Sequence, residues 1–353
     1  MFEQVHEYQF HGQPVVALRP DGWLFDHGHI TDSSGVSVLG TISGTSGHGS
    51  GSTLSPSASS SFASNQTLVG SSTGLRIDLL WDSSVAHAPS SFKPAVTEAA
   101  TNLASLFPTT NEEINIHVGW GEVAGSPLAA NALGESVSNG YLTDYATVTD
   151  ALQQHEQLPS ATNEPTTSQF FITSAEAKAL GLVNATSNSV DGYIGFGSLS
   201  HTGDSWDFST SKTPIAANQF DLQAVVEHEI SEVMGRVGME GQVINGQPTY
   251  TPLDIFNFSS TPHTLELSAN GGYFSTDGTT DLGNYNAASA SGGDIADWAS
   301  AKSPAQSGTL PSTAPANTYD SFDAFAAPGY VGQLTSSDLL EMEALGYGSP
   351  TTA

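Results

Sequence analysis

Apolar and polar residues alternate along the first part of the chain, in short stretches that turn residues separate. The apolar positions fall at Tyr8 and Phe10, at residues 15–18 and at residues 23–25, with Arg-Pro-Asp-Gly at 19–22 between the last two stretches. A period of two between turn signals is typical of short β-strands. We therefore predict a small β-rich hairpin unit over residues 1–40.

A stretch rich in Ser, Gly and Thr follows over residues 41–74. It offers few apolar positions that would anchor a strand or a helix, so we interpret it as a linker. The character of the sequence changes at Leu75, where segments of ordinary hydrophobic content begin. These changes predict one large domain over residues 75–353 after the hairpin unit and the linker.

The large domain is predicted to contain both strands and helices. The expected strands are residues 76–81, 114–121 and 193–196. Apolar residues at helical spacing predict helices over 91–107, 144–157, 174–180 and 221–235, and a capping sequence that begins at Thr335 predicts a final helix through Leu345. Residues 251–299 are expected to be mostly loop and short strand. The predicted fold class is α+β.

Charge distinguishes this chain more than its length does. Among 353 residues, 7 Lys and Arg accompany 36 Asp and Glu, which gives a formal net charge of -29 at pH 7. So acidic a protein repels nucleic acid and anionic membranes, and it favours metal cations. The sequence also lacks an apolar run long enough to span a bilayer. We therefore expect neither nucleic-acid binding nor membrane insertion.

The composition favours a secreted protein. Cysteine is absent, so disulfide bonds are excluded. Ser, Thr, Gly, Asn, Ala and Asp dominate and Lys is scarce, as is typical of extracellular bacterial proteins. Residues 1–30 show no basic segment followed by an apolar run, so no Sec-type signal is visible. We expect an extracellular protein whose export route the sequence does not define.

The predicted helix over 221–235 carries the candidate chemistry. His228 and Glu232 are four residues apart, so one face of a helix presents both, and one metal ion can bridge them. Glu229 is offset from that face and would reach a metal-bound water as general base. Such groups among Val and Ile are costly to bury unless they bind something. The alternative is an ordinary acidic helix that contains one histidine by chance.

The segment 227–235 resembles the active-site helix of metzincin-like peptidases, whose signature opens HExxHxxG. The order of the predicted strands and helices and the final helix also resemble that clan. Residues 81–85, 118–123 and 294–298 are similar to a group of secreted bacterial metalloproteases. The resemblance covers residues 75–353 and implies a zincin domain, with a twisted mixed sheet, an active-site helix and a loop-rich C-terminal subdomain.

The chain departs from the metzincin signature at its ligand positions. Glu232 stands in place of the second histidine and Gly238 in place of the third, and no obvious Met-turn methionine follows. In leishmanolysin-like enzymes the third ligand lies far downstream, and the matching residue here is Asp297. The resemblance therefore implies a metal held by His228, Glu232 and Asp297. Other candidates for the third ligand are Asp254, His263 and His201.

Two carboxylates and one neutral imidazole would cancel the charge of a divalent ion. Zinc is the ion expected from the resemblance, and oxygen-rich ligation also suits Mn²⁺ or Ca²⁺. The expected function is a secreted metal-dependent endopeptidase that acts on a protein or peptide substrate, with Glu229 as general base. The alternatives are a non-catalytic extracellular metal-binding protein for surface attachment or assembly, and another kind of hydrolase. Residues 1–70 stay open between a propeptide, a binding module and an assembly arm.

Overall fold

The computed structural model describes the backbone of three N-terminal strands and most of the chain beyond Asn65. The N-terminal strands are β1 (His6–Phe10), β2 (Gln13–Leu18) and β3 (Ser34–Thr41). The fully described ranges are 65–128, 132–199, 203–211, 213–244, 246–287, 294–299 and 318–348. Across them the protein has the mixed α+β architecture that the sequence predicts.

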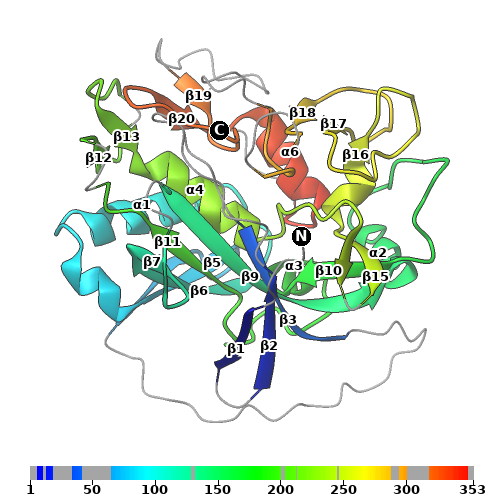
Figure 1. Ribbon diagram of the computed structural model, residues 1–353, viewed down its shortest axis with the longest axis horizontal. Coiled ribbons are helices and arrows are strands. Elements are labelled where there is room, and N and C mark those ends of the chain that lie inside the picture. Colours follow the sequence, from blue (N-terminus) through cyan, green and yellow to red (C-terminus); the bar gives the residue numbers. More distant parts are fainter. Residues whose placement is uncertain are drawn as a thin grey trace.

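A large mixed sheet forms the centre of the fold (Figure 1). Its order is β1-β2-β3-β9-β11-β6-β5-β4. In chain order the fully described strands on this path are β4 (Gln66–Gly70), β5 (Arg76–Trp81), β6 (Glu113–Trp120), β9 (Gly134–Asp144) and β11 (Gly192–Phe196). The strands β5, β6 and β11 run parallel, whereas β9 is antiparallel to β11. Off this path lie β10 (Gln169–Thr173), β14 (Gln242–Ile244) and β15 (Gln247–Tyr250).

Two long helices pack against each other and against this sheet. They are α1 (Phe92–Ser105) and α4 (Leu222–Val233). Alternate residues of β5 and β6, such as Ile77 and Ile116, are fully buried and belong to the same hydrophobic core as the inner face of α1. This period-two burial is what the strand predictions anticipated. The shorter helices α2 (Tyr145–Leu152) and α3 (Ser174–Ala179) lie beside β9 and β10.

The C-terminal part consists of short elements, as the sequence predicts for residues 251–299. Its small sheets contain β16 (Asn257–Phe258), β17 (Gly272–Phe274) and β18 (Gly283–Tyr285), and the pair β19 (Thr318–Asp320) and β20 (Val331–Gln333). The final helix α6 (Ser336–Ala344) begins at Thr335, whose side chain forms the expected capping box with Asp338. Smaller elements are η1 (Ser83–His87), η2 (Leu253–Phe256), β7 (Glu122–Val123), β8 (Ser126–Pro127), β12 (Ser205–Asp207) and β13 (Gln219–Asp221).

Two predicted boundaries look different in the structure. The helix expected over 144–157 ends at Leu152, because the amides of His155 and Glu156 both bond to the Leu152 carbonyl in a closing turn. The strand β4 falls inside the range predicted as a linker and pairs along its length with β5. The expected boundary at Leu75 therefore lies between two paired strands. The apolar stretch at 23–25 lies outside the described residues.

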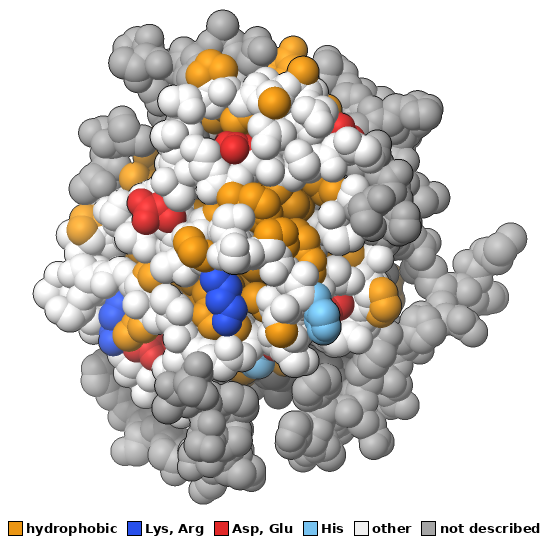
Figure 2. Space-filling model, turned by 90° about the vertical axis from the view of Figure 1, so that its left-hand side faces the viewer, with side chains coloured by type: hydrophobic (Ala, Val, Ile, Leu, Met, Phe, Trp, Pro, Cys, Tyr) orange, Lys and Arg blue, Asp and Glu red, His pale blue; other side chains and the backbone are white. Residues whose placement is uncertain are grey.

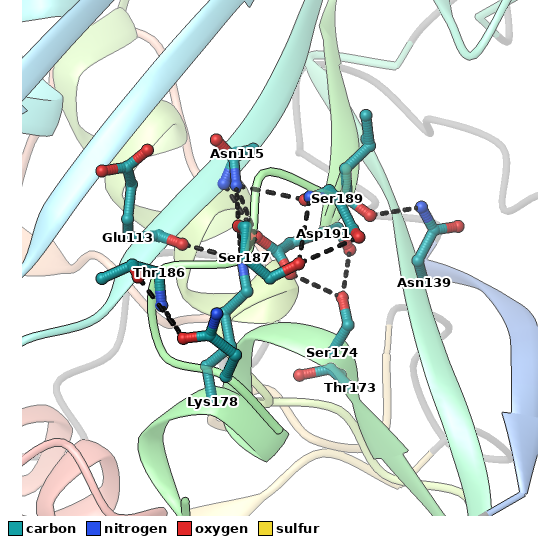
Figure 3. A network of polar contacts seen from close by, with 12 residues as sticks. Glu113, Asn115, Asn139, Thr173, Ser174, Lys178, Thr186, Ser187, Ser189 and Asp191 are labelled. Atoms are coloured by element: carbon teal, nitrogen blue, oxygen red, sulfur yellow. Dashed lines mark hydrogen bonds and ion pairs between the residues drawn. The ribbon is translucent and has the colours of Figure 1, made fainter. Parts of the chain in front are cut away.

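A buried ion pair fixes the position of β9 relative to its neighbours (Figure 3). Lys178 Nζ lies 2.5 Å from Asp191 Oδ2 and donates to the backbone carbonyls of Glu113 and Ser187. Asp191 also accepts from the Asn115 amide of β6. Next to it, the Asn139 side chain of β9 donates to the carbonyl of residue 190. These bonds join α3, β6, β9 and the segment before β11.

Part of the acidic excess lies inside the protein. The face in Figure 2 shows mainly uncharged side chains, with hydrophobic ones gathered near its centre and few acidic ones. Carboxyl side chains that are buried include Asp78, Glu176, Asp191, Glu229, Asp320 and Glu341. Burial of an ionised carboxylate is expensive without a cation or a proton, so the interior acids need partners. Within the described residues, no helix is both long and apolar enough to cross a membrane.

Candidate metal centre

The helix α4 places its polar side chains in the interior. Asp221 caps its first turn by accepting from the amides of Gln223 and Ala224, and every residue of the helix is buried. The helix stops before Gly235, which has a φ of 121°, and a Cβ there would lie 2.9 Å from Glu176 Oε2. A side chain at this position is therefore excluded both by conformation and by space. The chain turns here and brings Arg236 back towards the helix.

Three side chains from two distant segments converge beside α4. His228, Glu232 and Asp297 each offer one ligand atom, and the three atoms lie within 4.8 Å of one another. His228 Nε2 is 3.6 Å from Glu232 Oε1 and 3.3 Å from Asp297 Oδ1. These are the three residues that the sequence analysis named as ligands, and we refer to them as the donor cluster. Their exposed fractions are 4% for His228, 1% for Glu232 and 0% for Asp297.

The backbone orients the imidazole of His228. Its Nδ1 lies 2.8 Å from the carbonyl oxygen of Ser321. A carbonyl only accepts, so Nδ1 carries the proton and donates, and the electron pair of a neutral imidazole is then on Nε2. The Phe322 ring packs edge-on against the imidazole, with ring centroids 6.4 Å apart. The segment between β19 and β20 therefore aims Nε2 at the two carboxylates.

Arg236 contacts both carboxylates of the donor cluster. Its Nη1 lies 2.5 Å from Asp297 Oδ1, and its Nη2 lies 3.5 Å from Glu232 Oε1. Burial opposes ionisation of Asp297, but attraction to His228 and Arg236 holds the pKa of Asp297 below its ordinary value. The other oxygen, Asp297 Oδ2, has no hydrogen-bond partner in the described part of the chain. One oxygen of Asp297 is thus left for a further cation.

Strand β9 contacts the carboxylate side chains of α4. Ser136 Oγ donates to Glu232 Oε2 at 2.6 Å, which turns Glu232 Oε1 towards His228. Glu229 lies over Gly134, where a Cβ would overlap Glu229 Oε1. Only glycine allows this approach. The position of both side chains on α4 is therefore set by residues about a hundred positions earlier in the sequence.

Glu229 is a buried carboxyl beside the donor cluster. It is 0% exposed, and neither of its oxygens has a hydrogen-bond partner among the described residues. Burial, followed by repulsion from Glu232, raises the pKa of Glu229 well above its ordinary value, although His228 and Arg236 oppose the rise. The folded protein therefore favours the protonated form of this carboxyl. Proton transfer to or from a neighbouring group is the chemistry that it can perform.

Two of the other candidate ligands, Asp254 and His263, do not belong to the donor cluster. Asp254 Oδ2 accepts from the amides of Met239, Glu240 and Thr251, at 3.2, 3.1 and 2.7 Å, and so anchors a backbone turn. His263 Nδ1 bonds to the carbonyl of Ser160 in a loop. His201 lies outside the described residues. Asp297 is therefore the third donor that this arrangement offers.

The carboxyl of Glu240, next to Asp254, gives a pH-dependent prediction. Burial and the charge of Asp254 raise the pKa of Glu240 to about 10, and Asn257 donates to it at 2.8 Å. The ordinary pKa of this carboxyl is 4.5. At a pH between that value and the pKa in the folded chain, the folded protein holds a proton on Glu240, and unfolding releases it. The free energy of unfolding therefore falls as pH rises through that window, by at most about 1.4 kcal/mol per pH unit from this group.

In Glu240→Gln the neutral amide keeps an acceptor for Asn257. We expect urea unfolding at pH 6, 7.5 and 9 to show a smaller decline with pH for this variant than for the wild type. At pH 9 the variant should be more stable by about 1 kcal/mol or more. The matched control is Glu98→Gln on the exposed face of α1, which should keep the wild-type slope. An unchanged slope in Glu240→Gln would contradict the assignment.

Sequence reasoning missed the residues that support the donor cluster. Ser136 and Ser321 contact it from other segments, and nothing in their local sequence marks them. Arg236 does follow the predicted helix closely, so a basic residue near a cluster of acids was a usable signal. Ser136 and Ser321 lie in stretches without a distinctive pattern.

Comparison of the chain with protein-family models, with curated proteins and with solved structures finds no match. The geometry of the donor cluster and the residues around it therefore carry the functional argument.

Proposed function

We propose that this protein is a metal-dependent endopeptidase whose divalent ion is held by His228, Glu232 and Asp297. One observation carries the proposal: an imidazole nitrogen and two carboxylate oxygens converge within 4.8 Å in a buried setting. Three electron-pair donors that face one another out of water repel unless a cation or protons lie between them. A divalent ion satisfies all three at once, and it also suits the remaining oxygen of Asp297.

When bound, the ion would supply Lewis acidity, polarising a substrate carbonyl and acidifying a water. The residues of the chain supply the rest. Glu229, in its ionised form, would take a proton from the attacking water and later deliver it to the leaving amine. Ser136 and Ser321 orient Glu232 and His228 through one hydrogen bond each. Gly134 leaves room for the Glu229 side chain.

A peptide substrate is proposed from the resemblance to metzincin-like peptidases. The succession of β5, α1, β6, β9, β11 and α4 fits the expected subdomain before an active-site helix. Gly238, which stands where the metzincin signature has its third histidine, lies next to the segment that carries Asp297. A Cβ on Gly238 would lie 3.1 Å from Ile295 Cγ1, so the segment that carries Asp297 fills this space. The acidic, lysine-poor composition, rich in Ser, Thr and Gly, supports an extracellular location.

Arg236 changes the expected charge of the site. The donor cluster carries two negative charges, and the guanidinium beside it adds one positive charge. A divalent ion then gives a net charge of about +1 with Glu229 protonated and about zero with Glu229 ionised. We propose zinc, with Mn²⁺ and Ca²⁺ as alternatives that oxygen ligands favour. Repulsion by Arg236 would weaken the binding of any of these ions.

Removal and return of the metal tests the proposal. We expect the purified chain to contain about one equivalent of a divalent metal and to digest casein. Dialysis against a chelator should abolish digestion, and one equivalent of Zn²⁺ or Mn²⁺ should restore it. Bound metal with no hydrolysis of casein or gelatin under any ion, by the wild type or by a variant whose N-terminal strand β3 is disrupted, would refute an endopeptidase.

The second candidate is a non-catalytic metal-binding protein, and the closeness of Arg236 favours it. The Arg236–Asp297 pair already satisfies one ligand oxygen, and the donor cluster is almost fully buried. This candidate predicts bound metal that raises thermal stability without hydrolysis. The same metal analysis and digestion assay therefore separate the two candidates.

A further inference from the structure

The strand β3 occupies one edge of β9 beside the donor cluster. Ser136 of β9 pairs with Ile194 of β11 and also with Ser34 of β3, and Ser138 likewise has a partner in each strand. A strand has two hydrogen-bonding edges, so β11 and β3 must lie on opposite sides of β9. From Ser136 to Leu142 the outer edge of β9 is filled by the N-terminal segment of the same chain.

This edge belongs to the strand that supports the proposed site. Ser136 donates to the Glu232 carboxylate, and Ser138 Oγ donates to the Glu232 carbonyl at 3.2 Å. Gly134, two residues earlier, touches Glu229. A peptide that added to this edge as a strand would run directly alongside the proposed base and ligand. Backbone pairing of this kind is largely independent of side-chain sequence, which suits a protein-degrading enzyme.

We propose that β3 is an intramolecular occupant of the β9 edge, and that displacement of β3 opens this edge to an extended peptide. The inference rests on the proposed function, because it names where that enzyme's substrate would enter. With β3 in place, the residues of the donor cluster and Glu229 are at most 4% exposed. The N-terminal residues were left open between a propeptide, a binding module and an assembly arm. The proposal favours the propeptide-like role, in which β3 covers the site.

The attachment of the N-terminal unit suits displacement. The strands β1 and β2 follow β3 outward in the sheet order, so the β3–β9 ladder joins the unit to the rest of the sheet (Figure 1). The register of this ladder shifts between Val38 and Gly40, which interrupts its pairing. Residues 42–64 then connect β3 to the described domain by a sequence rich in Ser and Gly. One cut there would release the unit from its covalent tether.

Val36→Pro in the full-length chain tests the occupancy. Val36 pairs with Ser138 of β9 and with Leu18 of β2, so proline here removes a ladder hydrogen bond and fits poorly in a central strand. The matched control is Val15→Pro, because Val15 pairs with Tyr8 in the outer hairpin. We expect the amides of 136–142 to exchange hydrogen for deuterium about tenfold faster in Val36→Pro than in the wild type. Val15→Pro should leave them unchanged.

A binding measurement tests the opened edge without using catalysis. A fluorescent peptide of residues 6–41 is added at micromolar concentration to each full-length variant, and its anisotropy is followed. We expect the peptide to bind Val36→Pro and not the wild type or Val15→Pro. Equal exchange and equal peptide binding in Val36→Pro and the wild type would overturn the inference.

A second route covers the case in which Val36→Pro fails to fold. A cleavage sequence for a specific protease, inserted after Ser59 in the full-length chain, allows the connection to be cut after folding. The cut protein should exchange its own segment for the labelled peptide, whereas the uncut protein should not. If the cut protein also excludes the peptide, the inference is wrong.

Different results would refute the proposed endopeptidase and the proposed occupancy of the β9 edge. If Val36→Pro binds the peptide but no variant digests casein with any metal, the inference is supported and the endopeptidase is refuted. If the wild type digests casein as fast as Val36→Pro and excludes the peptide equally, the endopeptidase stands and the inference is overturned.

Discussion

Glu229→Gln is expected to reduce the rate of casein hydrolysis by about 10³-fold and to leave the metal content unchanged. Glutamine has nearly the same shape as glutamate, so it fits the space beside Gly134 that the Glu229 side chain occupies. It cannot accept a proton, so the attacking water loses its base. Glu229 is not one of the three donors of the cluster, so the ligands for the metal remain in place.

Two measurements on one preparation check this expectation: elemental analysis for bound metal and initial rates of hydrolysis. Glu98→Gln is the matched control, since Glu98 lies on the exposed face of α1. Hydrolysis by Glu229→Gln at the wild-type rate would refute the assignment of the base. Loss of metal together with activity would make Glu229 a ligand instead.

His228→Ala is expected to weaken metal binding by more than about 100-fold, because even partners that only orient metal ligands contribute 10- to 100-fold. The substitution removes the one nitrogen donor and leaves two carboxylates that Arg236 already attracts. It also removes the bond to the Ser321 carbonyl, so circular dichroism must show that the fold persists. Equilibrium dialysis or calorimetry with Zn²⁺ gives the change in dissociation constant.

The matched control is His117→Ala. His117 lies on β6, where its Nδ1 pairs with Asp82 at 2.6 Å, and it does not contribute to the donor cluster. This variant should bind metal as tightly as the wild type. A His228→Ala protein that keeps its full metal content would refute both the endopeptidase and the non-catalytic metal-binding candidate.

Sequence patterns were sufficient for elements whose signals are local. Apolar residues at helical spacing and the Asp221 cap define α4, and four-residue spacing places His228 and Glu232 on one face. The capping sequence at Thr335 predicts the start of α6 and is confirmed. These features depend on residues a few positions apart, which is why they can be read without the fold.

Strand β9 was missed because most of its buried residues are polar. Its sequence contains Ser136, Ser138 and Asn139 at buried positions, so apolar and polar residues do not alternate as in a typical half-buried strand. These side chains are buried because they bond to α4 and to the segment before β11. The pattern that would have identified the strand was replaced by residues that support the site.

The contacts of the donor cluster with other segments were beyond sequence reasoning. Asp297 was named through the resemblance, since no physical rule connects it to a helix some sixty positions earlier. The Arg236–Asp297 pair and the approach of Gly134 to Glu229 depend on how the chain returns in space. The same holds for β3, whose place on β9 follows from sheet topology rather than from its composition.

A crystal of the metal-loaded protein, measured at the absorption edge of the added ion, tests the central claim most directly. We predict one strong anomalous difference peak between His228 Nε2, Glu232 Oε1 and Asp297, at about 2.0–2.2 Å from the ligand atoms if the ion is zinc. Density for Arg236 should show its guanidinium displaced from Asp297 Oδ1 or sharing that carboxylate with the ion. No anomalous peak at this position, with Arg236 still bridging the two carboxylates, would contradict the account.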